Sequence, residues 1–411
     1  MSPPSTVSAS PSRADSRWQT LMLAFCLALS PAVAIGFGRF AYALVLPAMK
    51  SDLGWSFGQA GMMGTANAVG YLLGATLTGP ALRLWKPRPL LLAGLALTLV
   101  ALWGAALAHS FGPLLFFRGL VGFSAAFVFI CATGLAARLG RNAEENALAM
   151  GITICGPGIG TILTGILVPF VLDGDASHWP RAWGLMGILG LLAFAVVALA
   201  SRGMSGTTRD INSEQGDKEV EVKKGELAFV YGSYFAFGLG YIAYMTFLVA
   251  FVRGLNASGE MVALVWSCLG AAMVGSSWVW KARLARNTGG QTMALMGLGG
   301  AVCALLPLCL ALAPALTLPI LLTSAMGFGA TTMPVVTAVT VLIRRHLPSA
   351  QWNGAIASVT AVFATGQSIG PVVAGKLSDQ FGASASLWWS AALLGVAAFI
   401  ALLQKPKEEH T

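Results

Sequence analysis

The sequence predicts an all-α membrane protein in which twelve transmembrane helices form two six-helix repeats. Three observations predict this fold class. The 411 residues are 56% hydrophobic and only 10% charged, whereas a soluble globular domain carries roughly 25% charged residues. The apolar residues gather in stretches of the length that a helix needs to cross a bilayer, about 20 residues. A glycine-containing motif in the first stretch also returns in the seventh.

Twelve segments of the chain meet this length requirement, and polar or turn-forming residues separate them. The two shortest separating loops, at residues 109–113 and 312–316, each contain a proline. The predicted helices cover, in order, residues 20–48, 58–81, 89–108, 113–137, 147–172, 181–201, 226–252, 260–281, 291–312, 315–343, 354–376 and 384–403.

The distribution of Lys and Arg predicts the orientation of these helices. If the N-terminus is cytoplasmic, 19 of the 25 Lys and Arg residues lie in cytoplasmic segments and only four, Lys50, Arg181, Arg253 and Lys376, lie outside. Cytoplasmic loops of membrane proteins carry such an excess. We therefore expect a multi-pass protein with both termini in the cytoplasm. The net charge of +9 follows mostly from this topology, so membrane lipids and not nucleic acid are the expected partners.

The chain contains an internal duplication. Residues 36–42 read GFGRFAY and residues 238–244 read GLGYIAY, so four of seven positions match. The only long polar stretch inside the chain separates the two copies. We therefore expect a disordered cytoplasmic tail over residues 1–17, a six-helix bundle over 18–201, a cytoplasmic linker over 202–225, a second six-helix bundle over 226–403 and a cytoplasmic tail over 404–411.

Residues that could support enzymatic chemistry or a metal site are sparse. The six cysteines all fall within predicted helices without metal-ligand spacing, and the four histidines fall in loops or in the C-terminal tail. We interpret the cysteines as small apolar packing residues and expect no disulfide, no metal and no cofactor. No glycine-rich phosphate-binding loop with a following lysine occurs, so the sequence does not predict ATP-driven chemistry. We expect a protein that is not an enzyme.

Arg39 and Arg118 are the two cationic residues placed within predicted helices. An arginine at a helix centre costs about 2.5–3.5 kcal/mol on membrane-insertion scales. All 16 acidic residues fall in loops or at helix ends, so no carboxylate in a helix core can neutralise these charges. Because a guanidinium binds carboxylate or phosphate through paired hydrogen bonds, we interpret both residues as ligands of an anionic cargo. The alternative is that their long side chains reach the lipid head groups.

Neutral polar residues at a similar depth in both repeats could orient such a cargo. Tyr42 lies one turn from Arg39 on the same helix face. For each of these residues, a hydrogen bond that only packs helices together is an alternative. Tyrosine rings would suit an aromatic or branched organic acid. The remaining candidates are Asn67, Tyr241, Tyr244, Thr331, Thr332 and Gln367.

Two Gly-Pro pairs fall at matching places in the repeats, Gly156–Pro157 and Gly370–Pro371. Proline removes a backbone hydrogen bond and bends a helix. A bend that recurs in both halves indicates a moving part, whereas most of the 49 glycines are interpreted as residues that permit close helix packing.

Several motifs resemble the major facilitator superfamily (MFS) over residues 18–403. Residues 114–126, LLFFRGLVGFSAA, are similar to its helix-four pattern, and Gly156–Pro157 resembles a helix-five pattern often associated with exporters. Residues 375–382, GKLSDQFG, resemble its Gly-x-Leu-x-Asp-x-x-Gly loop and contain Asp379, while the loop after the second helix lacks that acid. The Gly36 motif resembles the little-characterised bacterial YbfB/YjiJ-type branch.

This resemblance implies the MFS fold and transport by alternating access, and it adds gating roles to the residue assignments. Arg118 could serve proton transfer or gating instead of binding cargo, and Asp379 would belong to a gating loop. We expect a monomeric secondary active transporter of the bacterial inner membrane that moves a small organic anion, coupled to protons or to a counter-anion. An exporter of drug-like or lipophilic, neutral or acidic molecules is the alternative, and a transport-inactive sensor or scaffold is a third hypothesis.

Overall fold

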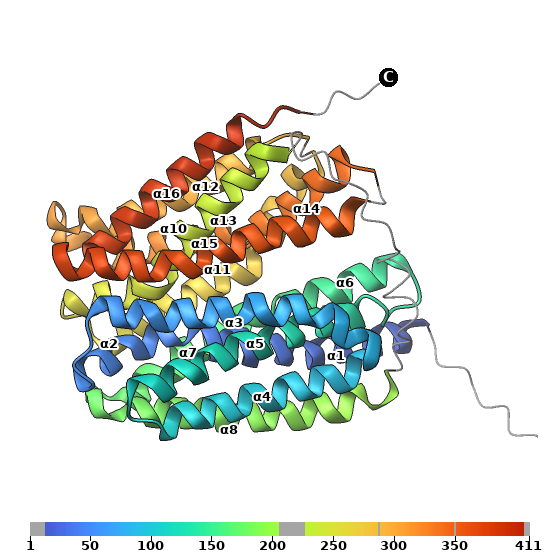
Figure 1. The fold of residues 1–411 in the computed structure, drawn as a ribbon, viewed down its shortest axis with the longest axis horizontal. Coiled ribbons are helices and arrows are strands. Elements are labelled where there is room, and N and C mark those ends of the chain that lie inside the picture. Colours follow the sequence, from blue (N-terminus) through green and yellow to red (C-terminus); the bar gives the residue numbers. More distant parts are fainter. Residues whose placement is uncertain (1–12, 205–226, 287, 349–350, 407–411) are drawn as a thin grey trace, which may run out of the picture.

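The computed structural model describes residues 13–204, 227–286, 288–348 and 351–406, and these ranges are almost entirely helical (Figure 1). No strand occurs within them. The α-helices are α1 (Arg13–Pro31), α2 (Tyr42–Asp52), α3 (Phe57–Leu84), α4 (Pro87–Leu107), α5 (Phe111–Ala136), α6 (Ala143–Ile154), α7 (Gly156–Leu172), α8 (Trp179–Ala200), α10 (Ala228–Gly254), α11 (Gly259–Ala285), α12 (Gln291–Leu305), α13 (Thr317–Thr332), α14 (Val335–His346), α15 (Trp352–Phe381) and α16 (Ser384–Leu402). The shorter helices are the π-helix η1 (Ala32–Phe40) and the 3-10 helices η2 (Ala176–His178), η3 (Ser201–Gly203), η5 (Leu306–Ala311) and η6 (Pro314–Leu316).

Each predicted transmembrane segment corresponds to one helix or to helices in direct succession. The first segment combines α1, η1 and α2, the fifth α6 and α7, the ninth α12 and η5, and the tenth α13 and α14. The predicted tail over 1–17 is too long, because α1 already begins at Arg13. The predicted linker over 202–225 starts inside η3. Residues 205–225 of that linker, residues 1–12 and residues 407–411 lie outside the described residues.

Eleven helical stretches in the described part of the chain are long and apolar enough to cross a membrane. Helix α3 is not among them although it has 28 residues, because six glycines, three threonines, one asparagine and one glutamine lower its mean hydropathy. It packs extensively against both α5 and α15. Contacts with protein, more than contacts with lipid, therefore accommodate the polar composition of α3.

The helices before and after residues 205–226 form two halves that lie side by side (Figure 1). Extensive contacts between the halves join α3 to α15, α7 to α11 and α2 to α10. The halves lie close together at the end of the molecule that contains α2 and further apart at the opposite end, which contains α6 and α14 (Figure 1). We call these the α2 end and the α6 end.

The duplicated glycines mark a helix contact that both halves contain. A Cβ atom at Gly36 would lie 2.6 Å from the Cα atom of Gly160 in α7, and one at Gly238 would lie 2.6 Å from the carbonyl oxygen of Phe363 in α15. Both distances are too short for any side chain, so glycine permits the backbones to approach. In each half the contact joins the first transmembrane segment to the fifth, which explains why the motif recurs.

The two copies of the motif differ in backbone geometry. Residues 32–40 form a π-helix, whose pattern continues in the bond from the backbone N of Ala41 to the oxygen of Gly36 at 2.9 Å. The corresponding part of α10 is a regular α-helix. π-helical turns are rare and are found frequently at functional sites. Arg39 lies in the last turn of this segment.

Helices α3 and α5 of the first half are packed closely at Gly122. A Cβ atom at this position in α5 would lie 1.9 Å from the carbonyl oxygen of Asn67 in α3. Gly122→Ala should therefore lower the free energy of unfolding by about 1–3 kcal/mol, as overpacking does. Gly134→Ala in the same helix is the matched control, because nothing lies within 4 Å of its added Cβ. That control should leave stability unchanged or raise it by up to about 1 kcal/mol, and thermal unfolding in detergent would measure both changes.

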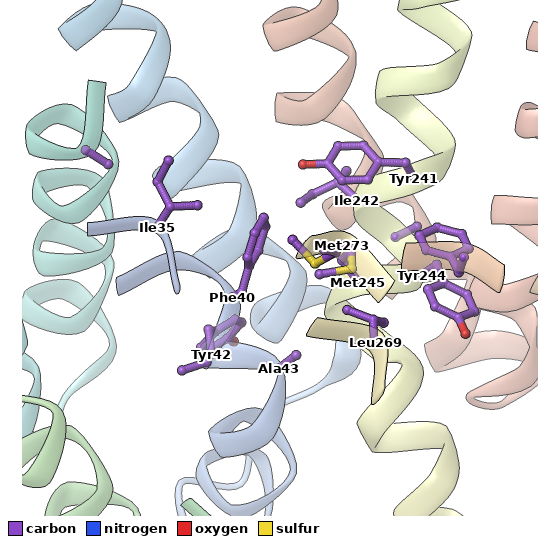
Figure 2. Packing of buried hydrophobic residues seen from close by; sticks show 14 of the residues in the cluster. Ile35, Phe40, Tyr42, Ala43, Tyr241, Ile242, Tyr244, Met245, Leu269 and Met273 are labelled. Carbon is purple, nitrogen blue, oxygen red and sulfur yellow. The ribbon is translucent and has the colours of Figure 1, made fainter. Parts of the chain in front are cut away.

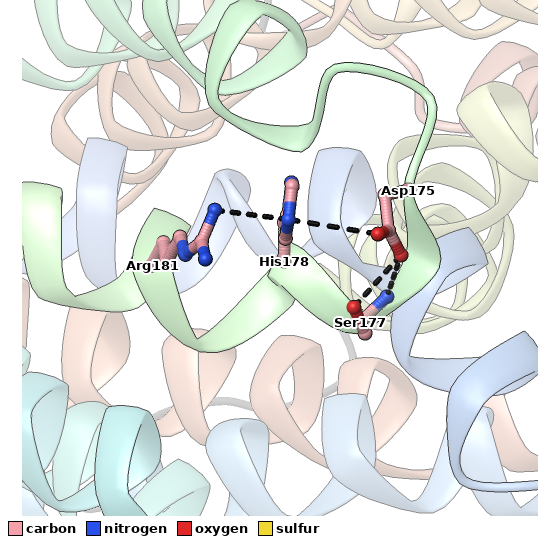
Figure 3. Close-up of polar contacts among 4 residues, drawn as sticks. All are labelled: Asp175, Ser177, His178 and Arg181. Carbon is pink, nitrogen blue, oxygen red and sulfur yellow. Dashed lines mark hydrogen bonds and ion pairs between the residues drawn. The ribbon is translucent and has the colours of Figure 1, made fainter.

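The loop between α7 and α8 is held by a polar cluster (Figure 3). Asp175 accepts hydrogen bonds from the backbone N and the Oγ of Ser177, both at 2.8 Å. Nε2 of His178 lies 2.9 Å from Nη1 of Arg181 and 3.5 Å from a carboxylate oxygen of Asp175. The hydrogen bonds from Ser177, and then the charges of His178 and Arg181, hold the pKa of Asp175 below its usual value. These contacts therefore stabilise the folded state at a pH above the ordinary pKa of aspartate. This stabilisation is lost as the pH falls through the lowered pKa of Asp175.

Candidate functional site

A small cavity lies where the first transmembrane segment meets α3, α5 and α10. Its volume is about 20 Å³, which is room for roughly one water molecule. Figure 2 shows Phe40 directed toward Ile242 and Met245 of α10 across this contact. The residues that line the cavity are Arg39, Phe40, Tyr42, Ala43, Gly64, Asn67, Arg118, Ile242, Met245 and Thr246. Both arginines singled out in the sequence therefore border the same space.

Arg118 is buried in the first half. Only 3% of its surface is exposed, and its guanidinium carbon lies 4.4 Å from the ring centre of Tyr42 and 5.7 Å from that of Trp183. Its Nη1 donates to the carbonyl oxygen of Gly38 in the π-helix, and its Nε has no hydrogen-bond partner. Aromatic faces and one carbonyl thus stabilise the charge. The side chain does not extend to the surface.

Arg39 connects the two halves. Its Nη2 donates to Oε1 of Gln367 in α15 at 2.9 Å, and the Nε2 of Gln367 donates to the hydroxyl of Tyr241 in α10 at 3.1 Å. The guanidinium carbon lies 5.6 Å from the ring centre of Tyr71 in α3. Arg39 is partly buried, whereas Gln367 is 3% exposed. A chain of polar contacts therefore runs from the π-helix into the second half.

Neither guanidinium forms an ion pair with a carboxylate among the described residues. The described acidic residues with placed side chains, Asp52, Glu144, Glu145, Asp173, Asp175, Glu260 and Asp379, lie in loops or within a turn of a helix end. Two positive charges therefore border a cavity in which the protein supplies neutral acceptors only.

Of the polar residues predicted to surround a cargo, the structure brings some together around the cavity and places others elsewhere. Tyr42 and Asn67 line the cavity with the arginines, with the Tyr42 hydroxyl bonded to the Ala60 oxygen at 2.8 Å and the Asn67 Nδ2 to the Arg118 oxygen at 3.2 Å. Gln367 is connected to the cavity by its hydrogen bond from Arg39, and Tyr241 by its hydrogen bond from Gln367.

Tyr244, Thr331 and Thr332 lie in the interior of the second half. The Tyr244 ring stacks on Phe328 with ring centres 3.7 Å apart, and its hydroxyl bonds Ser324 at 2.6 Å. Figure 2 shows Tyr244 on the side of α10 opposite to Phe40. Each threonine hydroxyl bonds a carbonyl of its own helix, as threonine in helices commonly does. The structure therefore does not bring these three residues to the cavity.

Several residues of the site were not predicted from the sequence. Tyr71 and Trp183 face the two guanidiniums, and Met245 and Thr246 contribute the α10 wall of the cavity. One signal was available for Tyr71, which follows Asn67 by four positions and so lies on the same face of α3. No comparable signal marks Trp183 or Met245 among so many apolar residues.

The two Gly-Pro pairs occupy different backbone environments. The fifth segment breaks at Cys155, directly before Gly156 and Pro157 begin α7. Helix α15 instead runs without interruption through Gly370 and Pro371. A Cβ atom at Gly61 of α3 would lie 2.2 Å from the carbonyl oxygen of Pro371. The second pair therefore lies directly at the contact between the halves.

Asp379 connects the halves at the α2 end. Its Oδ1 accepts from the backbone N of Phe57 at 2.6 Å and its Oδ2 from the backbone N of Gly58 at 2.8 Å. These are the first two N–H groups of α3, which have no partner within their own helix. A carboxylate of the second half therefore satisfies the positive N-terminus of a helix in the first half.

Sequence comparison identifies the family. A family model described as "Uncharacterised MFS-type transporter YbfB" matches residues 31–402. The chain belongs to this family. It is therefore a multi-pass membrane transporter of the major facilitator superfamily with a small-molecule substrate. No curated protein matches the sequence.

The fold of this YbfB-type chain is similar to those of solved transporters. A D-xylose–proton symporter gives a TM-score of 0.74 at 15% identity, covering 95% of this chain and 99% of the symporter. A variant of the nucleoside transporter NupG gives 0.71 at 14% identity, covering 93% and 99%. A bacterial homologue of the human lysosomal transporter Spinster, inward-facing and unoccupied, gives 0.68 at 14% identity, covering 96% of each chain. Similarity at these identities shows the fold alone.

Proposed function

We propose that this YbfB-type transporter carries a small organic anion with a carboxylate-like group by secondary active transport. The observation that carries the proposal is the placement of Arg39 and Arg118 at one cavity with no carboxylate partner in the described part of the chain. A buried charge without a partner is costly. An anionic cargo would supply the missing negative charge when it binds.

Arg39 is the main cargo ligand in this proposal. It is partly buried and lies at the boundary between the halves, where its bond to Gln367 can be exchanged for one to a cargo. Arg118 is deeper and already bonded to Gly38. It acts as a second ligand or as a gate, and Tyr42, Asn67 and Tyr241 orient the cargo.

The distribution of Lys and Arg supports a cytoplasmic α6 end, because the positively charged loops gather there. The halves meet at the α2 end and separate toward the α6 end (Figure 1). On this orientation the protein is closed to the outside of a bacterial inner membrane. A cavity of about 20 Å³ is too small for an organic anion. Cargo binding therefore requires the halves or the lining side chains to move, as alternating access requires.

Thermal unfolding of the purified protein against a ligand panel tests the cargo class. The panel contains aliphatic and aromatic carboxylates, phosphate esters, sugars and lipophilic drugs. A ligand at 100 times its dissociation constant adds about 2.7 kcal/mol to the stability of the folded state. We expect stabilisation by carboxylates and none by sugars.

Export of lipophilic molecules is the second candidate, because the fifth segment breaks at the Gly156–Pro157 pattern that resembles exporters. Stabilisation by neutral lipophilic drugs without any response to carboxylates would support it and contradict the anion proposal.

A further inference from the structure

We infer that Gln367 is a built-in competitor of the cargo: its amide oxygen occupies Arg39 in this conformation, and a bound anion displaces it. The inference rests on the proposed anion site and describes how that site is regulated. It differs from a role for Gln367 as a cargo ligand, because it predicts that removing the amide strengthens anion binding.

The geometry fixes which end of the amide meets the guanidinium. Because Nη2 of Arg39 can only donate, it must face Oε1 of Gln367, at 2.9 Å, which leaves Nε2 to donate to the Tyr241 hydroxyl at 3.1 Å. The side chain of Gln367 is 3% exposed and Tyr241 is 4% exposed. The amide is therefore held in one orientation, with its acceptor placed where an anion oxygen would meet Arg39.

The amide and an anion compete for the same donor of Arg39. The Nη2 group that would pair with an anion oxygen already donates to Oε1 of Gln367, so an anion that takes this donor must displace the amide. The cavity beside Arg39, which Gln367 does not line, has room for roughly one water molecule, so the halves must also move to admit an organic anion. The guanidinium charge strengthens both bonds, but a carboxylate adds its own negative charge and can accept two parallel N–H bonds, so it pairs with arginine more strongly than a neutral amide does. An anion can therefore replace the neutral amide, but part of its binding free energy is spent on breaking the Arg39–Gln367 bond.

The displaced bond is also a contact between the halves. Arg39 belongs to the first half and Gln367 to α15 of the second, and the next residue, Ser368, accepts from Thr65 of α3 at 2.6 Å. Cargo that takes over Arg39 releases one of these cross-half bonds. In this conformation the amide adds one bond to the contacts between the halves, and the arrival of cargo would remove that bond where the halves must separate.

Two substitutions at the same position have opposite expected effects. Gln367→Ala removes the competitor and should tighten the binding of benzoate and succinate, as aromatic and aliphatic probes, about tenfold, which corresponds to about 1.4 kcal/mol. Gln367→Glu places a carboxylate on Arg39 and should weaken the same probes at least 100-fold. Gln380→Glu, on the exposed part of the same helix, is the charge-matched control and should leave binding unchanged. Weaker binding to the Gln367→Ala variant would overturn the inference.

A readout without any cargo separates this inference from the proposed function. Gln367→Glu should raise the unfolding midpoint relative to Gln380→Glu, and Arg39→Gln in the same chain should remove that rise, because the new carboxylate pairs with Arg39. If no Arg39-dependent rise in the unfolding midpoint occurs, Arg39 and residue 367 are not in contact, and the inference fails whatever the cargo is. If the rise occurs but no anion binds to the wild type or to Gln367→Ala, the contact stands, and the competition and the proposed cargo class are both overturned.

Discussion

Replacing Arg39 by glutamine should abolish anion binding while leaving the protein folded and monodisperse in detergent. Glutamine keeps a polar side chain at the end of the π-helix but removes the charge and the paired donors. Hydrogen bonds to charged groups contribute about 1.5–3 kcal/mol each. Losing two of them weakens binding by a factor of about 100 or more, since 1.4 kcal/mol is tenfold. Ligand-dependent thermal unfolding with a carboxylate that stabilises the wild type measures this loss.

Two further variants show whether the loss belongs to this position. Arg83→Gln removes an exposed arginine near the end of α3 and should not change binding. Arg39→Lys keeps the charge but not the planar fork, so it should retain part of the affinity. Unchanged binding to Arg39→Gln would contradict the prediction. Arg39 would then have a structural role alone, which is to bond Gln367 across the two halves.

The sequence was sufficient to predict the helices and the charges of the site. Hydrophobic length located most of the transmembrane segments to within a few residues, because a helix that crosses a bilayer must be long and apolar. The absence of acidic residues from the predicted helix cores also identified Arg39 and Arg118 as cations that the neighbouring helices do not neutralise. The recurring glycines predicted a repeated unit, and the structure shows the helix contact that requires them.

The rotation of each helix about its axis could not be predicted in the same way. Tyr241 and Tyr244 have nearly the same depth, yet one bonds Gln367 and the other Ser324. Their helix, α10, is 78% buried over its most apolar window, so no lipid-facing side marks its orientation. The bond between Arg39 and Gln367 spans 328 positions, and only the packing of the halves brings its partners together.

Asp379→Asn should open the α2 end of the transporter. The carboxylate now accepts from the first two N–H groups of α3. An asparagine has only one acceptor atom, and its NH₂ group would face the other N–H donor. One charge-assisted bond is lost and the helix N-terminus loses its compensating charge. If only the closed state contains this contact, its loss shifts the balance toward states in which the α2 end is open by about tenfold to 100-fold.

Labelling of a half-buried position between the halves would report this shift. The hydroxyl of Thr65 in α3 donates to the Ser368 oxygen of α15, so this position becomes more accessible when the two helices separate. In a chain whose six native cysteines are replaced, Thr65→Cys should react with a maleimide faster when Asp379→Asn is added. Asp173→Asn is the matched control, because Asp173 is exposed in a loop and its positive φ of 42° is one that asparagine tolerates.

The contact of Asp379 is distinct from a simple helix cap because the carboxylate and the helix that it caps belong to different halves. Ser56 and Gln59 already form a capping box within the first half, so α3 keeps local N-terminal hydrogen bonds without Asp379. The helix should therefore stay folded in the Asp379→Asn variant, and only its attachment to α15 should weaken. An equal labelling rate with and without the substitution would mean that packing at Gly61 and Pro371 holds the α2 end closed by itself.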